Sequence, residues 1–300
     1  MVTDVIQAIF AALPVGCIYA LVALGVALIY NATNIINFAQ GEFVMLGGMT
    51  MVTLYGEMHL PIYLAIPASV AISSIIGMAL MKVAYRPGQN TSLLIVLIIT
   101  IGASLFISGS AMHIWDADIH KFPSFSGDRP ILFLGAAIVP QSLWVIGLTF
   151  ILVIFLVYFF QFTIHGKAMK ACAIDRTAAG LLGIKVKQMV LISFAMSSAL
   201  GAMAGIIMTP LTMIDYSGGM LLAIKGFSAA MLGGMGSFIG AVIGAFIFSF
   251  LESFTATFIS GSFKELVTFI VIINVLLFMP NGIMGPRARE GLEEEEVLGQ

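Results

Sequence analysis

Polar side chains gather in one short stretch of an otherwise apolar chain. Residues 31–42 hold six of them: Asn31, Thr33, Asn34, Asn37, Gln40 and Glu42. Because Asn favours turns and helix caps, the stretch can be a turn followed by a capped helix. It can equally be a partly unwound segment whose side chains border a path for a solute. In either case, a carboxylate in the first turn of a helix is stabilised by the positive end of the helix dipole.

The composition shows whether water or lipid surrounds most of the chain. Of the 300 residues, 60% are hydrophobic and only 9% are charged, whereas a soluble domain carries roughly 25% charged residues. Apolar runs of about 20 residues, enough to cross a hydrocarbon core as a helix, recur along the whole chain. The sequence therefore predicts an all-α integral membrane protein embedded in a lipid bilayer, and nothing in it indicates a nucleic-acid partner.

The lengths of the apolar runs, and the polar or Pro-containing stretches that separate them, predict about eight to nine transmembrane or half-membrane helices. The expected ranges are 5–30, 41–56, 61–82, 91–111, 140–162, 188–210, 222–235, 237–258 and 264–280. The second and seventh are short for a membrane crossing, which indicates half-helices. The first lacks the basic region of a signal peptide, and we expect it to be retained. Cys17 and Cys172 are expected to be free thiols, and four consecutive acids at 293–296 indicate a solvated tail.

Basic residues predict the orientation of the helices, since they collect in cytoplasmic loops. Nine crossings that start outside put all the residues of three basic groups on the cytoplasmic side: Lys82 and Arg86; Lys167, Lys170, Arg176, Lys185 and Lys187; and Arg287 and Arg289. We therefore expect a multi-pass protein of a plasma membrane with an external N-terminus and a cytoplasmic C-terminus.

The pentapeptide MLGGM occurs twice, at Met45–Met49 and Met231–Met235. The copies fall on predicted helices that cross in opposite directions, which indicates two inverted repeats around a transport path; a coincidence of common residues is the alternative. The candidate path then consists of Asn31, Asn34, Asn37, Phe38, Gln40, Glu42, Phe227, Ser228, Gly233 and Gly234. A single transmembrane domain, 1–300, would comprise a first repeat (1–111), an external loop with a connecting helix (112–162), a cytoplasmic loop (163–187), a second repeat (188–285) and the tail (286–300).

Small residues at a spacing of four predict close helix packing. Gly236, Gly240 and Gly244 form one such stripe, and Ser197, Gly201 and Gly205 form another. The stripes would hold helices of this chain together or mediate dimerisation. Two polar residues, Glu252 and Asn274, lie inside predicted spans, where interhelical hydrogen bonding and an ion or proton site are both open interpretations.

Motifs for catalysis are missing from the chain. It has no G-x-x-x-x-G-K-[ST], no H-E-x-x-H, no G-x-S-x-G and no group of clustered Cys and His residues. An enzyme is therefore not supported, and this chain is not expected to bind ATP or another cofactor. The loop 163–187 contains a short predicted helix around residues 175–183 that ends at a glycine C-cap. Such a helix is either a simple connection or a lever that docks into another protein.

Three stretches resemble a known family. GCIYALVALGVALIYNATNIINFAQGEFVMLGG (Gly16–Gly48), AIDRTAAGLLGIK, and KGFSAAMLGGMGSFIGAVIGA with the closing MPNGIMG are similar to branched-chain amino-acid ABC-importer permeases of the LivH type. The resemblance runs through nearly the whole chain. Ala178, Ala179 and Gly183 also match the broader importer motif E-A-A-x-x-x-G, although Thr177 replaces its Glu.

The resemblance implies an ABC-importer permease fold and a set of partners. Such a subunit pairs with a second, related permease, receives solute from an extracytoplasmic binding protein, and is driven by two cytoplasmic ATPase subunits that hold ATP and Mg. The helix around Asp175, Arg176, Ala178, Ala179 and Gly183 would couple it to an ATPase. Family substrates are Leu, Ile and Val, or urea and short amides, in a prokaryotic inner membrane. The alternatives are an ion-coupled secondary transporter or channel without ATPases, and a subunit that scaffolds a partner permease.

Overall fold

The structure, a computed structural model, describes residues 2–84, 93–127, 129–133 and 136–285. Arg86 and the predicted acidic tail lie outside the described residues. The described helices are α1 (Val2–Thr33), α2 (Gln40–Met51), the π-helix η1 (Val52–Glu57), α3 (Ile62–Ala84), α4 (Leu93–Trp115), α5 (Pro140–Phe162), α6 (Ile164–Ile174), α7 (Arg176–Leu181), α8 (Val186–Thr212), α9 (Gly218–Gly233), α10 (Phe238–Phe258) and α11 (Lys264–Phe278). A hairpin of β1 (Ile131–Phe133) and β2 (Ala136–Ile138) precedes α5.

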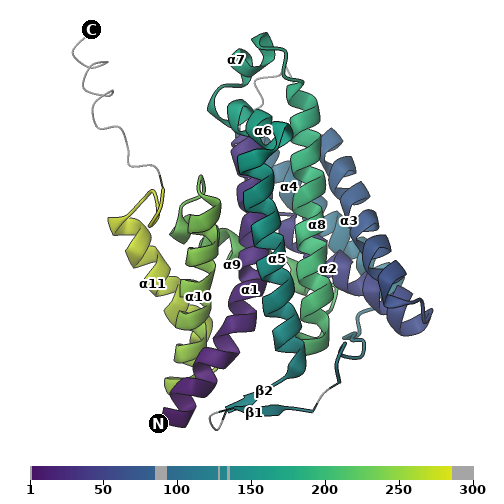
Figure 1. The fold of residues 1–300 in the computed structure, drawn as a ribbon, viewed down its shortest axis with the longest axis vertical. Helices are drawn as coiled ribbons and strands as arrows, with labels where there is room; N and C mark the ends of the chain where they lie inside the picture. Colours follow the sequence, from purple (N-terminus) through teal and green to yellow (C-terminus); the bar gives the residue numbers. More distant parts are fainter. Residues whose placement is uncertain (1, 85–92, 128, 134–135, 286–300) are drawn as a thin grey trace.

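Helices α1, α5 and α8 run roughly side by side, with α6 and α7 at one end of the bundle and the hairpin at the other (Figure 1). In the described part of the chain, α1, α3, α4, α5, α8 and α10 are long and apolar enough to cross a membrane. The prediction of an all-α membrane protein is therefore confirmed. Unpredicted features are the π-helical continuation of α2, the separate helix α6 and the short hairpin.

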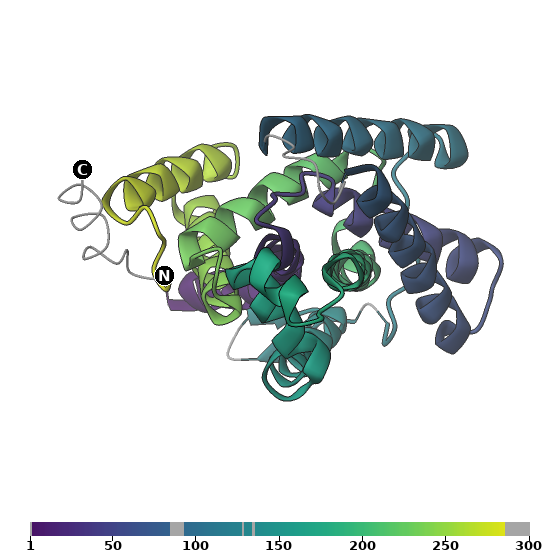
Figure 2. The same cartoon turned by 90° about the horizontal axis from the view of Figure 1, so that it is seen from above.

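Helix α1 forms the centre of the fold. Its most apolar window is 89% buried, against 22% for α4 and for α5, so α1 is shielded by protein while α4 and α5 present their apolar surface outward. It packs against α8, α9 and α10, and Figure 2 shows it surrounded by other helices. The core is rich in Ala, Leu and Val, which lets α1 approach its neighbours closely.

The two short helices α2 and α9 lie inside the bundle. All of α2 is buried. It packs on α8, whereas α9 packs on α1, and the two short helices also contact each other. The long helices pair in the same crossed way: α10, from the end of the chain, packs along α1, and α3, from the beginning, packs along α8.

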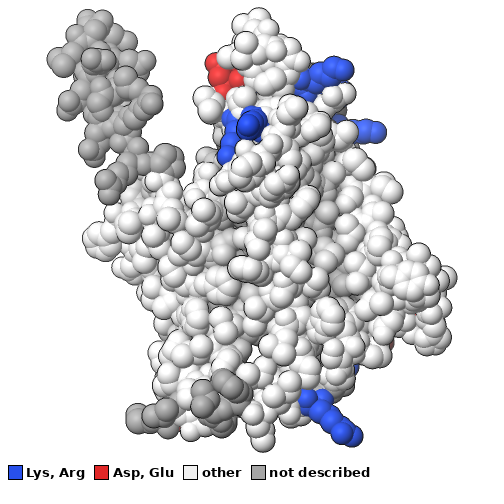
Figure 3. Space-filling model, in the orientation of Figure 1, with Lys and Arg blue, Asp and Glu red and all other residues white. Residues whose placement is uncertain are grey.

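Charge on the face shown in Figure 3 is concentrated near the α6–α7 end, above a broad uncharged belt. The exposed basic residues of that end include Lys167, Lys170, Lys185 and Lys187. An apolar belt of this kind suits contact with lipid, whereas the basic end suits contact with water and anionic headgroups.

Candidate translocation and coupling sites

The polar stretch predicted from the sequence forms the break between α1 and α2. Asn34, directly after α1, has a positive φ of 52°, a conformation that Asn tolerates better than most residues. Asn37 Oδ1 then accepts a hydrogen bond of 3.1 Å from the backbone N–H of Ala39, the residue that precedes α2. The stretch is therefore both a turn and a break at the start of a buried helix.

A second break with the same geometry separates α8 from α9. Met213, directly after α8, has a φ of 60°. Asp215 Oδ1 accepts hydrogen bonds from the backbone N–H of Ser217 at 2.7 Å and of Gly218 at 2.9 Å, at the start of α9. Both short helices are thus preceded by an Asx turn, in which a side-chain oxygen binds a backbone donor two residues later.

The first turns of α2 and α9 meet at a pair of glycines. A Cβ at Gly41 would collide with the backbone of Gly219, so neither position has room for a larger side chain. The carboxylate of Glu42 lies at the same crossing: a Cβ at Gly219 would come within 2.5 Å of Glu42 Oε2. Glu42 is 1% exposed and lies beside the N-terminal turns of two helices, where the helix dipoles stabilise a negative charge.

Glu42 and Gln40 each contact a long helix through a buried serine. Ser104 Oγ on α4 donates a 2.8 Å hydrogen bond to Glu42 Oε1, whereas Glu42 Oε2 has no hydrogen-bond partner among the described residues. Gln40 Nε2 donates to the backbone oxygen of Ser197 on α8, and Ser197 Oγ lies 2.6 Å from Gln40 Oε1. The residues predicted for a path are therefore also part of the packing of α2.

The remaining path candidates divide into two groups. The Phe38 and Phe227 rings lie 5.7 Å apart, which joins the start of α2 to the middle of α9, and Ser228 is half-buried beside Phe227 on α9. Gly233 and Gly234, in contrast, pack against the start of α10 and the turn 282–285. The glycines of the second MLGGM copy therefore pack at the turn between α9 and α10. In the first copy, Gly47 packs against Ala202 on α8 instead.

The end of α1 borders a cavity at the α6–α7 end of the bundle. The cavity has a volume of about 420 Å³ and is lined by parts of α1, α5, α6 and the start of α10. Asn31 lies in its wall, and Asn31 Nδ2 is buried without a hydrogen-bond partner in the described structure. Asn31 therefore lines this cavity, whereas Glu42 does not.

The predicted glycine stripes are close-packing positions, with one exception. A Cβ at Gly201 would meet Phe43, and one at Gly205 would meet the backbone of Val44, so α8 contacts α2 directly. Gly240 and Gly244 likewise pack against Gly233 of α9. Gly236, however, precedes the N-cap Ser237 and lies outside α10, because the chain is still turning at that position.

The helix predicted around residues 175–183 is α7. Asp175 caps it, since its Oδ1 accepts from the backbone N–H groups of Thr177 and Ala178 at 2.7 and 3.0 Å. Gly183 ends it with a φ of 83°, a conformation that glycine adopts without strain. Ala178 is exposed, Arg176 is half-buried, and Ala179 is buried against the body of the protein.

An exposed apolar surface on either side of α7 was not predicted. Ile174, Leu181 and Leu182 are more than four-fifths exposed at the basic end of the bundle (88%, 86% and 81%). Nearby, Cys172 is buried on α6; burial raises the pKa of its thiol, and Arg176 opposes part of that change. An apolar tip beside basic residues is typical of a surface that another protein covers.

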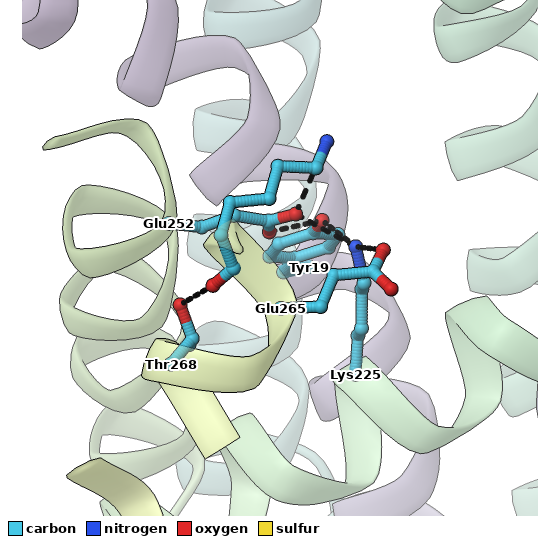
Figure 4. A network of polar contacts seen from close by, with 6 residues as sticks. Tyr19, Lys225, Glu252, Glu265 and Thr268 are labelled. Carbon is cyan, nitrogen blue, oxygen red and sulfur yellow. Dashed lines mark hydrogen bonds and ion pairs between the residues drawn. The ribbon is translucent and has the colours of Figure 1, made fainter. Parts of the chain in front are cut away.

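A buried ionic cluster, also not predicted, joins four helices (Figure 4). Lys225 Nζ on α9 lies 2.7 Å from Glu252 Oε1 on α10 and 3.1 Å from Glu265 Oε1 on α11. Tyr19 on α1 donates a 2.7 Å hydrogen bond to Glu252 Oε2, and Lys264 Nζ lies 3.6 Å from Glu252 Oε1. Of the two interpretations of Glu252, the structure shows interhelical hydrogen bonding, because its partners Tyr19 and Lys225 lie on other helices. The sequence signal that could have predicted this cluster was Lys225, a charged residue within the short apolar helix α9.

Asn274, the other polar residue noted inside a span, has a local role. Asn274 Nδ2 donates a 2.8 Å hydrogen bond to the backbone oxygen of Ile270, one turn earlier on α11, and its side chain is exposed. It therefore contacts neither the ionic cluster nor the α2–α9 crossing in the described structure.

These features define a polytopic α-helical membrane protein with two short inner helices, each preceded by a break, and an exposed short helix at its basic end. The fold resembles that of a chain in the PsaBC complex of Streptococcus pneumoniae, solved with a Fab, with a TM-score of 0.53 and 14% identity over 98% of this chain and 100% of that one.

Comparison of sequences identifies the family. Residues 8–276 match the family described as branched-chain amino acid transport system / permease component, and the chain belongs to this family. It is 32% identical to the high-affinity branched-chain amino acid transport system permease protein BraD of Pseudomonas aeruginosa, over 93% of this chain and 95% of that protein. The permease protein LivH of Escherichia coli K12 has the same identity and coverage. A probable LivH of Methanocaldococcus jannaschii is 29% identical over 88% of each chain.

Proposed function

We propose that this chain is the membrane-spanning subunit of an ATP-driven importer for the branched-chain amino acids Leu, Ile and Val. Support comes from relatives named for the transport of these solutes, which match the chain almost from end to end. The observation that carries the proposal within the structure is the pair of matched helix breaks at Asn37 and Asp215. Breaks at membrane depth are tolerated where the backbone is enclosed by protein or lines a solute path.

The chain consists of two related halves inserted in opposite directions. Four pairs of positions, each separated by about 180 residues, support this arrangement. The pairs are Asn34 and Met213, with positive φ; Asn37 and Asp215, with Asx turns; the starts of α2 and α9; and Gly47 and Gly226, which pack against Ala202 and Val22. The MLGGM copies, separated by about 186 residues, are out of register with these pairs.

The solute path runs beside the crossing of α2 and α9. Glu42 and the facing rings of Phe38 and Phe227 supply a polar group and an apolar surface there, as an amphiphilic amino acid requires. The two helices make their closest contact through Gly41 and Gly219, so a small relative movement opens or closes the crossing. The inverted halves expose the path to each side of the membrane in turn.

Helix α7 is the coupling helix, seated in one of two ATPase subunits that bind ATP and Mg in the cytoplasm. Its apolar tip and the surrounding lysines support this role. The basic end then faces the cytoplasm and the N-terminus faces outward, in accordance with the bias of basic residues. A second, related permease subunit and an extracytoplasmic binding protein complete the importer.

Reconstitution tests this function. Proteoliposomes that contain the permease pair, the two ATPases and the binding protein are expected to accumulate labelled leucine only with ATP on the ATPase side. A matched preparation without the ATPases is the control. Uptake that persists in the control would identify an ion-coupled transporter instead, and ATP-dependent uptake of urea with no uptake of leucine would change the substrate.

A further inference from the structure

We infer that the cavity beside the ionic cluster of Tyr19, Lys225 and Glu252 binds a zwitterionic α-amino acid with an apolar side chain. The inference rests on the proposed function and adds to it a solute site within the permease itself. The site lies between α1, α8, α9, α10 and α11, away from the α2–α9 crossing.

Charge balance excludes a ligand with a net charge, and the presence of both signs in the cluster favours a zwitterion over an uncharged solute. The cluster holds two ammonium groups, Lys225 and Lys264, and two carboxylates, Glu252 and Glu265. Side chains of Lys225 and Glu252 are 6% and 7% exposed, so a ligand with net charge would leave an uncompensated charge in a medium of low dielectric constant. A zwitterion adds one charge of each sign and preserves the balance. Buried ionisable groups inside an apolar helix bundle are costly, and they commonly mark functional sites.

The shape of the cavity fits the rest of such a ligand. Its volume is about 250 Å³, and its lining includes the apolar side chains of Val15, Ile18 and Met208 as well as Lys225 and Glu252. Ligand sites generally combine an apolar lining with a few converging polar groups, and this cavity has both. The apolar lining would hold a branched aliphatic side chain while the charges hold the head group.

Among the described residues, the cluster still has a free acceptor site for the ammonium of the ligand and a free donor for its carboxylate. Glu252 Oε2 accepts a bond from Tyr19, and a carboxylate oxygen has a second lone pair for the ammonium of the ligand. Lys264 Nζ, 3.6 Å from Glu252, is only loosely paired, and its side chain is 42% exposed. An ammonium has three donors, so Lys264 is placed to bind the carboxylate of the ligand.

The position of Lys225 connects this site to the broken helices. Lys225 lies on α9, and its partners lie on α10 and α11. A ligand ammonium that competes for Glu252 would weaken the contact of α9 with α10. A purely structural tie would need the ion pairs alone, whereas the cavity has no role in such a tie.

A cavity-filling substitution tests the site without removing any charge. Ala256 on α10 lines the cavity, whereas Thr257, the next residue, is exposed and does not. Ala256→Phe is expected to weaken equilibrium binding of tritiated leucine to the purified complex, without binding protein, by about tenfold or more, and Thr257→Phe to leave it unchanged. Met208→Trp, from α8, provides an independent filler if Ala256→Phe does not assemble.

Ligand analogues test the head group. Isopentylamine lacks the carboxylate of leucine and 4-methylpentanoate lacks its ammonium, so each is expected to displace labelled leucine about tenfold less effectively than leucine itself. Lys264→Met is expected to remove the preference for leucine over isopentylamine. Equal displacement by all three compounds in the wild-type complex would overturn the inference.

Two results separate this inference from the proposed function. If the wild type imports leucine with ATP but binds none up to millimolar concentration, or if both filled variants bind it normally, the inference is wrong and the importer remains. Failure of the wild-type complex to import leucine would instead contradict the proposed function.

Discussion

Asn37 and Asp215 make the same hydrogen bond at two distant places in the chain. Each side-chain Oδ1 accepts from the backbone N–H two residues later, at 3.1 and 2.7 Å, directly before a short buried helix. About 180 residues separate the two, and a similar distance along the chain separates Asn34 from Met213, the two residues of positive φ that precede them. The same local turn therefore precedes the short helix in each half of the chain.

Loss of either turn is expected to destabilise the protein. Asn37→Ala and Asp215→Ala each remove an acceptor for a donor at the start of a helix, at a cost of about 0.5–2 kcal/mol. Asp215→Asn keeps an acceptor oxygen and is expected to retain most of the stability. Asn274→Ala is the control, because Asn274 is exposed and bonds within its own helix. Thermal unfolding in detergent measures the difference, and equal midpoints for all four variants would contradict a stabilising role for the two Asx turns.

Glycines between helices are expected to tolerate no added methyl group. At Gly205 a Cβ would meet the backbone of Val44, so Gly205→Ala requires α2 and α8 to separate, at about 1–3 kcal/mol. Gly147 on α5 has no atom within 4 Å of its Cβ position, and Gly147→Ala is expected to be neutral or stabilising by up to about 1 kcal/mol. Thermal stability that falls as much for Gly147→Ala as for Gly205→Ala would show that the α2–α8 contact is not responsible.

Ser104 is expected to be needed by the buried carboxylate of Glu42. Ser104→Ala removes the donor to Glu42 Oε1 and leaves both oxygens without a partner, at a cost of about 1–3 kcal/mol. Ser110, also on α4, donates to the backbone within its own helix and is exposed, so Ser110→Ala should have little effect. Thermal unfolding of the two variants, measured side by side, tests this prediction. A similar loss of stability in both would exclude a special role for the contact between Ser104 and Glu42.

The apolar tip at α7 is expected to be needed for coupling but not for folding. Leu182→Asp places a charge in the proposed contact with the ATPase, and ATP-driven leucine uptake should fall by about tenfold or more, as expected when a contact residue is lost. Ile164→Asp is the matched control, because Ile164 on α6 is 83% exposed near the same end. Normal uptake by Leu182→Asp, at a normal level in the membrane, would remove α7 from the coupling interface.

Sequence reasoning recovered elements whose signals are local. The apolar runs predicted the long helices because lipid imposes a fixed length, and Gly183 marked the end of α7 through capping chemistry. The ion pair of Glu252 was not predicted, because its partner Lys225 lies on another helix. The MLGGM letters suggested the repeat, but the matching positions share backbone geometry, such as φ at Asn34 and Met213, more than residue type.

Cysteine labelling at the two helix breaks tests the inverted arrangement most directly. Asn34 and Met213 are both exposed and both have positive φ, so Asn34→Cys and Met213→Cys form a matched pair. The native Cys17 and Cys172 are buried and are replaced by Ala. A membrane-impermeant maleimide is expected to label Met213→Cys in intact cells, and Asn34→Cys only after the membrane is opened. Labelling of both positions from the same side would contradict the opposed insertion of the two halves.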